Sequence, residues 1–210
     1  MTTFVVRMWI PDRPGALGAV ASRVGAVGGD VVGIEILERG AGRAVDELVV
    51  ELEDESLVSL LISEVQQVDG VSVEDVRAIA DALRDPRLDA LETAAMLVGA
   101  STPASAIDEL CEHAVRTIGS AWGVVVSLDE VEVEASVGEP PDTAWLVAFV
   151  AGSQSSARVA AGKGGPDDVV WAPLPSARMA LVLGRHGTPF RARERRQAAA
   201  LAASLTPGFV

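Results

Sequence analysis

The sequence contains few of the residues on which many common functions depend. It has one cysteine, Cys111, and two histidines among 210 residues. A single cysteine excludes an internal disulfide framework and is typical of a reducing compartment. No apolar run approaches the roughly 18–20 residues that a membrane span requires, and the N-terminus lacks the order of basic, apolar and small residues found in a signal peptide. We therefore expect a soluble, cytoplasmic protein.

Motifs for catalysis and metal binding are also scarce. His113 and His186 are separated by a whole predicted sheet. His113 follows Cys111 by two residues, a spacing that turns helical side chains about 200° apart and makes a poor metal pair. We expect His113 at a surface or helix edge and Cys111 in the core. The glycine-rich segment 162–165 lacks the Ser or Thr that follows the lysine of a phosphate-binding loop, so we expect a flexible loop. The sequence thus predicts no catalytic residues, no metal and no cofactor.

Acidic side chains outnumber basic ones along the whole chain. The formal net charge is -13; residues 1–80 hold 6 basic and 14 acidic side chains, and residues 81–210 hold 11 and 16. Such a surface repels a phosphate backbone, because Lys and Arg supply most of the affinity for nucleic acid. The local exception is a group of arginines that we expect on a solvated helix face: Arg191, Arg193, Arg195 and Arg196. We expect neither nucleic acid nor a membrane as a partner.

Residues 4–34 hold the most informative pattern. Apolar residues alternate from Phe4 to Ile10 as in a strand, and a helical pattern begins at Leu17. Between them, Pro14 suits a first helical position and Asp12 suits an N-cap. The free amides at such a helix start, with little side-chain bulk at Gly15 and Ala16, suit a small anion such as a carboxylate. Ordinary helix punctuation without a ligand is the alternative.

These residues resemble an ACT domain. The string Asp-Arg-Pro-Gly-Ala-Leu at 12–17, and Gly-Asp-Val at 29–31, carry the resemblance, which covers residues 3–78. It implies a ferredoxin-like β-α-β-β-α-β order. The elements expected after the first helix are a strand at 31–38, a hairpin turn at 40–42, a strand at 44–52, a helix at 55–68 and a strand at 71–77.

The resemblance implies a ligand site between two subunits. The residues expected there are Asp12, Arg13, Gly15, Ala16, Leu17, Asp30 and Val31. Many family members that bind amino acids have asparagine where this chain has Asp12 and Asp30, and an ionised carboxylate only accepts hydrogen bonds. We therefore expect both carboxylates to hold a ligand ammonium while loop amides hold its carboxylate. We also expect the two loops to lie at one end of the sheet; capping and turning the chain, without a ligand, is the alternative role of both residues.

Beyond Arg77 the spacing of apolar residues changes from that of a strand to that of a helix. We place a linker at 79–87, where Pro86 disfavours helical geometry in the residue before it. We therefore expect two domains, an ACT-like domain at 1–78 and a second domain at 88–210. The later segment opens a capped helix at Ser101-Thr102-Pro103 that runs to Ile118. The further elements expected are strands at 123–128, 131–137, 169–174 and 179–185, a short helix at 143–150, loops at 152–156 and 162–168, and a last helix to about 205.

The second domain resembles a GAF domain. Trp171-Ala172-Pro173-Leu174, then the run 179–185, then Pro189-Phe190 before an Ala- and Leu-rich helix carry this resemblance. It implies a six-stranded antiparallel sheet flanked by helices that senses a small ligand. Residues 138–168, where the family builds its pocket, are short and weakly patterned, so we expect a degenerate domain with a lost or altered pocket.

The combined expectation is an α+β, non-catalytic regulatory protein. It would bind a small metabolite, with an amino acid as the expected class, at the interface of an ACT homodimer and signal to a protein partner. One alternative is a ligand-free dimerisation scaffold that docks an enzyme or regulator. A metabolic enzyme is a more distant alternative, because it would need a nucleophile or metal set that the sequence does not offer. Trp9 is expected either at an interface or on a covered core face.

Overall fold

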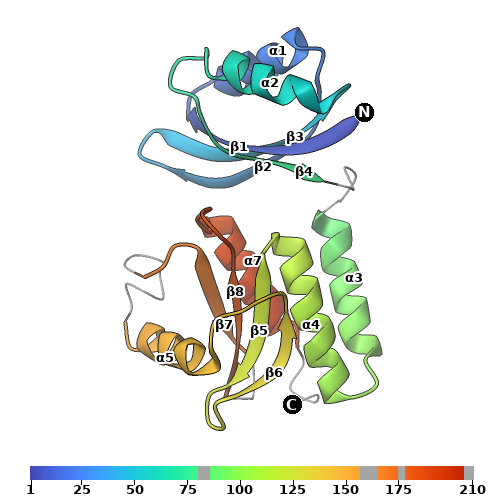
Figure 1. Ribbon diagram of the computed structural model, residues 1–210, viewed down its shortest axis with the longest axis vertical. Coiled ribbons are helices and arrows are strands. Elements are labelled where there is room, and N and C mark those ends of the chain that lie inside the picture. The colour runs from blue at the N-terminus through green and yellow to red at the C-terminus, as the bar shows by residue number, and fades with distance from the viewer. Residues whose placement is uncertain (80–85, 157–164, 175–177, 206–210) are drawn as a thin grey trace. The chain divides into compact units, whose positions relative to one another are not determined.

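The computed structural model describes residues 1–79, 86–156, 165–174 and 178–205. The chain divides into two compact units, Met1–Arg84 and Asp85–Val210, which are described separately (Figure 1). This division falls inside the expected linker, 79–87, of which residues 80–85 lie outside the described part. Among the described residues, no helix is both long and apolar enough to cross a membrane.

The first unit has the β-α-β-β-α-β order that the sequence predicts. Its elements are β1 (Thr2–Pro11), α1 (Ala16–Ala26), β2 (Asp30–Gly40), β3 (Arg43–Leu52), the short 3-10 helix η1 (Glu55–Leu57), α2 (Val58–Val65) and β4 (Ser72–Ile79). The strands form an antiparallel sheet in the order β2-β3-β1-β4. The expected helix at 55–68 is therefore a 3-10 turn followed by a shorter α-helix.

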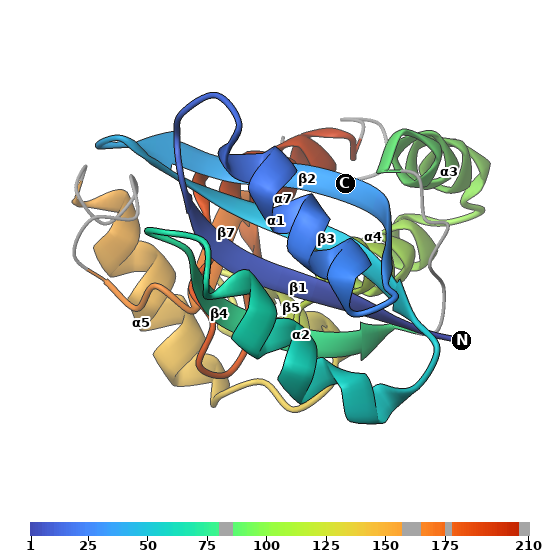
Figure 2. The same ribbon diagram turned by 90° about the horizontal axis from the view of Figure 1, so that it is seen from above.

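Both helices of the first unit lie over one face of its sheet (Figure 2). The side chains of Phe4, Val6 and Met8 alternate into the core beneath them, and each is no more than 3% exposed. Arg7 and Trp9 point to the other face, because successive residues of a strand point to opposite faces. The alternation read from the sequence therefore correctly separates the core face of β1 from its polar face.

The hairpin between β2 and β3 turns at Ala41 and Gly42. Both residues have positive φ, 51° and 75°, and lie between the paired residues Gly40 and Arg43. Two positive φ angles in a two-residue loop are typical of a type I′ turn, whose twist matches that of the strands. The expected hairpin at 40–42 is confirmed.

The start of α1 differs from the expectation. The helix begins at Ala16, and its N-cap is Gly15, with φ of 86° and no side-chain capping bond. Asp12 is therefore not the N-cap, and Pro14 does not occupy a first helical position. The reason is local: the Ala16 amide donates to the Arg13 carbonyl at 3.3 Å, which forms a turn that places Gly15 in the left-handed region.

The second unit contains another antiparallel sheet with helices. Its elements are α3 (Pro86–Gly99), α4 (Pro103–Ile118), β5 (Trp122–Ser127), β6 (Glu132–Val137), α5 (Thr143–Gln154), β7 (Val169–Pro173), β8 (Met179–Gly184) and α7 (Ala192–Ala203). The strand order is β6-β5-β8-β7. The described residues thus form four strands here, against six implied by the GAF resemblance. The helix expected at 143–150 extends to Gln154, into the predicted loop at 152–156.

The start and end of α4 follow the sequence signals. The Thr102 side chain accepts from the Ser105 amide at 3.1 Å, and the Ser105 hydroxyl accepts from the Thr102 amide at 3.1 Å. This reciprocal capping box satisfies amides that a helix start leaves free. Gly119 ends the helix with φ of 70°.

The sheet of the second unit is apolar on both faces. Val125 packs in a cluster with residues of α4 and α7, whereas Val124 and Val126 pack against Leu146 and Val150 of α5. All five of these side chains are fully buried. A strand buried on both faces reads as a continuous apolar run, which is the pattern of β5.

Candidate functional site

The loop between β1 and α1 is the region to which the ACT resemblance assigns a ligand. The Asp12 amide donates to the Gly42 carbonyl at 2.9 Å, and this bond attaches the loop to the β2–β3 hairpin. A Cβ added at Gly15 would meet no atom within 4 Å. The loop therefore has the low side-chain bulk that the sequence predicts, although the positive φ of Gly15 disfavours any other residue there.

Two of the three expected anion-binding amides are free. The Ala16 amide already donates to Arg13, as described above. Within the described part of the chain, the amides of Gly15 and Leu17 have no backbone acceptor. Such amides, at the positive end of a helix, can donate to a carboxylate. The Ala16 amide is thus already used within the loop, and its expected bond to a ligand stays a prediction.

Asp12 and Asp30 lie at opposite ends of the sheet within one protomer. Pro11, next to Asp12, pairs with Arg43, whereas Asp30 pairs with Glu51. Arg43 and Glu51 are eight positions apart on β3, which corresponds to about 27 Å at the usual rise per residue. The expectation that the two loops converge in one sheet is therefore wrong. Val31 lies with Asp30 at the start of β2, and Arg13 is exposed in the Asp12 loop.

A third carboxylate, Asp46, lies on β3 three positions from Arg43, which pairs with Pro11 next to the Asp12 loop. Asp46 pairs with Met8 and points to the same, helix-covered face of the sheet. Its side chain is only 5% exposed, and its Oδ1 atom has no hydrogen-bond partner among the described residues. Asp46 was absent from the expected site, although one sequence signal could have identified it: it interrupts the inward-facing series of β3, where Ala44 and Leu48 are apolar.

Burial raises the pKa of the Asp46 carboxyl above its ordinary value. The positive charge of Arg39 acts in the opposite direction and lowers it, while the negative charge of Asp12 raises it further. A buried carboxylate beside a second carboxylate favours either a proton or a bound cation. Burial and Asp12 thus both disfavour the ionised carboxyl of Asp46 unless a positive group lies near it.

The sheet face turned away from α1 and α2 carries charged side chains. Arg7 donates to Glu47 Oε1 through Nε at 2.9 Å and Nη2 at 2.7 Å, and Arg77 donates to the same oxygen at 3.1 Å. Trp9 donates to Glu74 at 3.3 Å and stacks under the guanidinium of Arg43. Trp9 therefore belongs to this charged face and not to the core beneath the helices.

His113 and Cys111 of α4 are both buried. His113 is 2% exposed, because α3 covers its side of α4, so the expected surface or helix-edge position is wrong. The Thr93 hydroxyl of α3 donates to the Asp89 carbonyl at 2.8 Å and lies 2.9 Å from His113 Nδ1. Burial, with Asp108 and Glu112 nearby, raises the pKa of the Cys111 thiol to about 12. The expected core position of Cys111 is confirmed, and a protonated thiol is a poor nucleophile.

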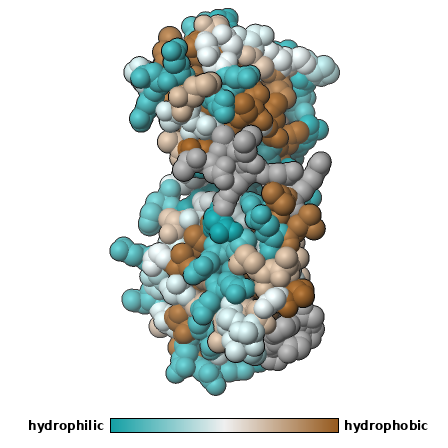
Figure 3. All heavy atoms as spheres, turned by 90° about the vertical axis from the view of Figure 1, so that its right-hand side faces the viewer, coloured by the Kyte–Doolittle hydropathy of each residue, from teal (hydrophilic) through white to brown (hydrophobic). Residues whose placement is uncertain are grey.

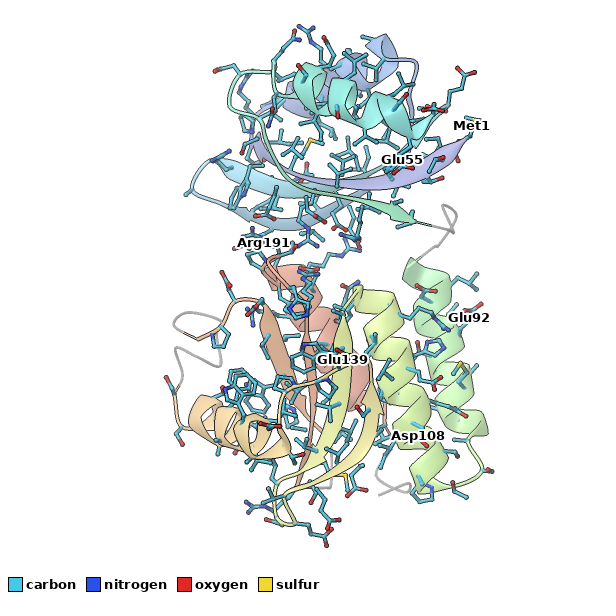
Figure 4. All side chains as sticks on the ribbon, viewed as in Figure 1. Met1, Glu55, Glu92, Asp108, Glu139 and Arg191 are labelled. Carbon is cyan, nitrogen blue, oxygen red and sulfur yellow. The ribbon has the colours of Figure 1, made fainter. Side chains whose placement is uncertain are left out.

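The remaining candidate groups do not form a centre. The described residues contain no cluster of His, Cys, Asp and Glu that could hold a metal ion. In the glycine-rich segment 162–165, residues 162–164 lie outside the described part. Arg191 precedes α7 as its N-cap (Figure 4), and Arg195 donates to the carbonyl groups of Asp167 and Val169. The expected solvated arginine face is therefore not fully solvated.

Comparison with known proteins identifies the first unit only. Residues 4–70 match the family model of the ACT domain. No family matches the second unit, and no curated protein matches the chain.

Several solved structures are similar at low identity. A crystal structure of an unknown protein from Galdieria sulphuraria is 15% identical, with a TM-score of 0.33; the match covers 47% of this chain and 63% of that one. An ACT domain protein from Streptococcus pneumoniae is 12% identical, with a TM-score of 0.30 and coverage of 37% and 89%. The solution structure of the ACT domain from GTP pyrophosphokinase of Chlorobium tepidum is 17% identical, with a TM-score of 0.28 and coverage of 39% and 91%. Together with the observed strand order, the family match shows that residues 4–70 of this chain form an ACT domain.

Proposed function

We propose that the protein is a non-catalytic regulator whose ACT domain binds a small amino acid between two copies of the chain. The observation that carries this proposal is the loop before α1. It combines the free amides of Gly15 and Leu17 with the carboxylate of Asp12. Donors for a carboxylate and an acceptor for an ammonium thus lie within a few residues, as a zwitterion requires.

The proposed site needs a second copy. Asp12 and Asp30 lie about 27 Å apart along one sheet, so only a partner can bring its Asp30 and Val31 to the Asp12 loop. The outer edge of β2 offers a surface for that partner, because among the described strands β2 pairs only with β3. Val32 and Ile34 on this strand are 41% and 50% exposed. A long edge strand with exposed apolar residues is a template for pairing with another chain.

Ligand screening by thermal unfolding tests the proposal. A ligand of this size is expected to bind at tens to hundreds of micromolar, about -5 to -6 kcal/mol. At roughly 100 times the dissociation constant, such a ligand stabilises the folded state by about 2.7 kcal/mol, which raises the Tm by roughly 5–10 °C. Each common amino acid would be added to the full chain at about 10 mM, which corresponds to 100 times a dissociation constant of 0.1 mM.

Two variants make the screen specific. Asp12→Ala should remove the stabilisation by the active amino acid, and Asp108→Ala, an exposed aspartate on α4, should retain it. Ile34→Lys should reduce both dimerisation and ligand binding, whereas Val133→Lys, on an edge strand of the other sheet, should change neither. Absence of stabilisation by every amino acid would refute the sensing role.

We further propose that the second unit is a degenerate GAF-like domain without a ligand of its own. The sequence resemblance and the antiparallel sheet flanked by helices support this interpretation. Leu146 and Val150 of α5 pack against Trp122 and Val124, so side chains of the chain itself fill that side of the sheet. Residues 157–164 of the expected pocket region lie outside the described part.

A ligand-free interaction scaffold is the second candidate, and α3 favours it. Leu88, Leu91 and Val98 are 54%, 68% and 76% exposed, and with Ala95 they follow the 3–4 spacing of a helix-pairing stripe. In an antiparallel pair of α3 helices from two copies, Leu91 of each would face Val98 of the other across the small Ala95. Figure 3 shows apolar areas beside polar ones on the face of this unit that includes α3.

Sedimentation separates the two candidates. If the protein is a scaffold joined through α3, Leu91→Glu should convert a dimer to a monomer. Leu60→Glu, at an exposed leucine of α2, is the matched control and should leave the dimer intact. A dimer that survives Leu91→Glu and dissociates with Ile34→Lys would support the ACT interface instead.

A further inference from the structure

Asp46 is a buried carboxylate with an unused hydrogen-bonding atom. It lies on the helix-covered face of the sheet and is 5% exposed, and its Oδ1 atom has no partner among the described residues. Buried polar atoms are almost always hydrogen-bonded, and a lone buried charge costs several kcal/mol or takes up a proton. A carboxylate in this position therefore needs an explanation beyond packing.

The charged groups that act on Asp46 come from two neighbouring segments. Asp12, in the loop before α1, repels it, and Arg39, near the end of β2, attracts it. No ion pair joins Arg39 to Asp46 in the described residues, so the buried oxygen stays free. Pro11, next to Asp12, pairs with Arg43, which lies three positions from Asp46 on β3, so the two carboxylates lie toward the same end of the sheet and both would attract a positive group placed there.

We propose that Asp46 is the buried anchor for the ammonium group of the small ligand, with Asp12 as its exposed partner. This inference rests on the proposed ligand-binding role and adds to the site a buried residue from the same protomer as Asp12, while Asp30 and Val31 still come from the second copy. It also defines the ligand class. The ligand must carry a protonated amine, since two carboxylates offer only acceptors. Deaminated analogues should fail to bind.

At a pH near or below the raised pKa of Asp46, ligand binding should release a proton from its carboxyl group. In the free protein, burial and Asp12 favour the protonated carboxyl, whereas Arg39 favours the ionised one. A bound ammonium favours the ionised form and so lowers the pKa of Asp46. Binding should therefore weaken as the pH falls through the pKa of Asp46 in the free protein, because the ammonium must then displace a proton.

The test uses carbon-13 NMR of the aspartate carboxyl groups in the full chain, with ethylammonium chloride and sodium acetate as probes. The Asp46 signal is assigned by its loss in Asp46→Asn. Ethylammonium should lower the Asp46 pKa, and acetate should not. Asp46→Asn should weaken binding of ethylammonium and of any active amino acid by about tenfold or more, the loss of at least one charged hydrogen bond. Asp69→Asn, in the exposed turn after α2, is the matched control and should bind as the unchanged protein does.

The outcomes distinguish this inference from the proposed function. Stabilisation by an amino acid that is equal in the unchanged protein and in Asp46→Asn would overturn the role of Asp46 and leave amino-acid sensing intact. A response of Asp46 to ethylammonium, without stabilisation by any amino acid, would support the amine site and remove amino-acid sensing. An Asp46 signal unaffected by every amine would overturn the inference whatever the screen gives.

Discussion

The two units build similar four-stranded antiparallel sheets and treat the second face of the sheet differently. In the second unit, both faces are apolar and both are covered by helices, so β5 is buried along its whole length. In the ACT domain, α1 and α2 cover one face, and the other carries Arg7, Glu47 and Arg77 in one hydrogen-bonded group. The comparison shows how helical cover decides the side-chain pattern of a strand. Strands covered on one face alternate between apolar and polar residues, and strands covered on both faces are apolar throughout.

A charge introduced into the middle of each sheet should give the largest difference in stability between the two units. Val124→Glu puts an unpaired carboxylate where the side chain is fully buried, and it should destabilise the second unit by about 4 kcal/mol or more. Val5→Glu puts the same group on the charged face of β1, directly across from Arg77; Val5 is also buried, at 6% exposed, but the nearby guanidinium should keep the loss smaller than that of Val124→Glu. Amide hydrogen exchange in the full chain reports the stability of each unit. Equal losses of stability in Val124→Glu and Val5→Glu would contradict the claim that the charged face of the ACT sheet accepts a carboxylate better than the apolar sheet of the second unit does.

The next largest effect should come from the ion pair of the second unit. Arg185 makes two bonds to Glu194, at 2.7 and 2.9 Å, and donates to the carbonyl groups of Thr188 and Pro189. Removing one partner of such a buried pair typically costs about 3–5 kcal/mol, so Arg185→Ala should lower the urea midpoint of this unit markedly.

The matched control for that pair is Arg178→Ala. Arg178 pairs with Asp129 at 2.8 Å, but the two side chains are 75% and 58% exposed. A pair this exposed contributes about 0–1 kcal/mol. Similar urea midpoints for the two variants would contradict the claim that the buried ion pair between Arg185 and Glu194, which links the end of β8 to α7, stabilises this unit.

Glu47 should show a smaller effect in the ACT domain. Its Oε1 atom accepts from both Arg7 and Arg77, so Glu47→Gln removes the charge that holds two guanidinium groups. We expect a loss of about 1–3 kcal/mol, measured as faster amide exchange in β1 and β3. Glu64→Gln, which changes the more exposed pair with Arg23, is the control and should cost less than about 1 kcal/mol.

The smallest effect should be a gain. Asp46→Asn removes a buried charge, so it should stabilise the ACT domain at pH 7 by about 1 kcal/mol. Since the pKa of Asp46 is raised in the folded state, its ionisation disfavours folding above that pKa and the penalty disappears as the pH falls through it. The advantage of the variant should therefore shrink on acidification. An advantage that grows on acidification would contradict the raised pKa.

Much of the fold was predictable because local signals carry it. Alternation placed Phe4 and Met8 in the core of the ACT domain, and the capping residues Thr102 and Gly119 bounded α4. The start of α1 was not predictable in the same way. Pro14 and Asp12 suit a helix start in isolation, but the positive φ of Gly15 places the boundary later.

The candidate site was harder to predict because it depends on tertiary contacts. The separation of Asp12 from Asp30 follows from the pairing of β1 and β2 with β3, which the sequence does not state. The burial of His113 requires the packing of α3 on α4, and periodicity in one helix does not reveal its neighbour. Asp46 did interrupt an apolar series, and that local signal was available before the structure.

The single bond from the Asp12 amide to the Gly42 carbonyl has a mechanical consequence. It couples the segment that precedes α1 to the tip of the hairpin whose outer strand has an unpaired edge. Any molecule that immobilises that segment also restrains the hairpin, and through it the alignment of the edge. Binding of a molecule to the loop and self-association through the β2 edge would then be coupled. Either event should slow hydrogen exchange of the Asp12 amide.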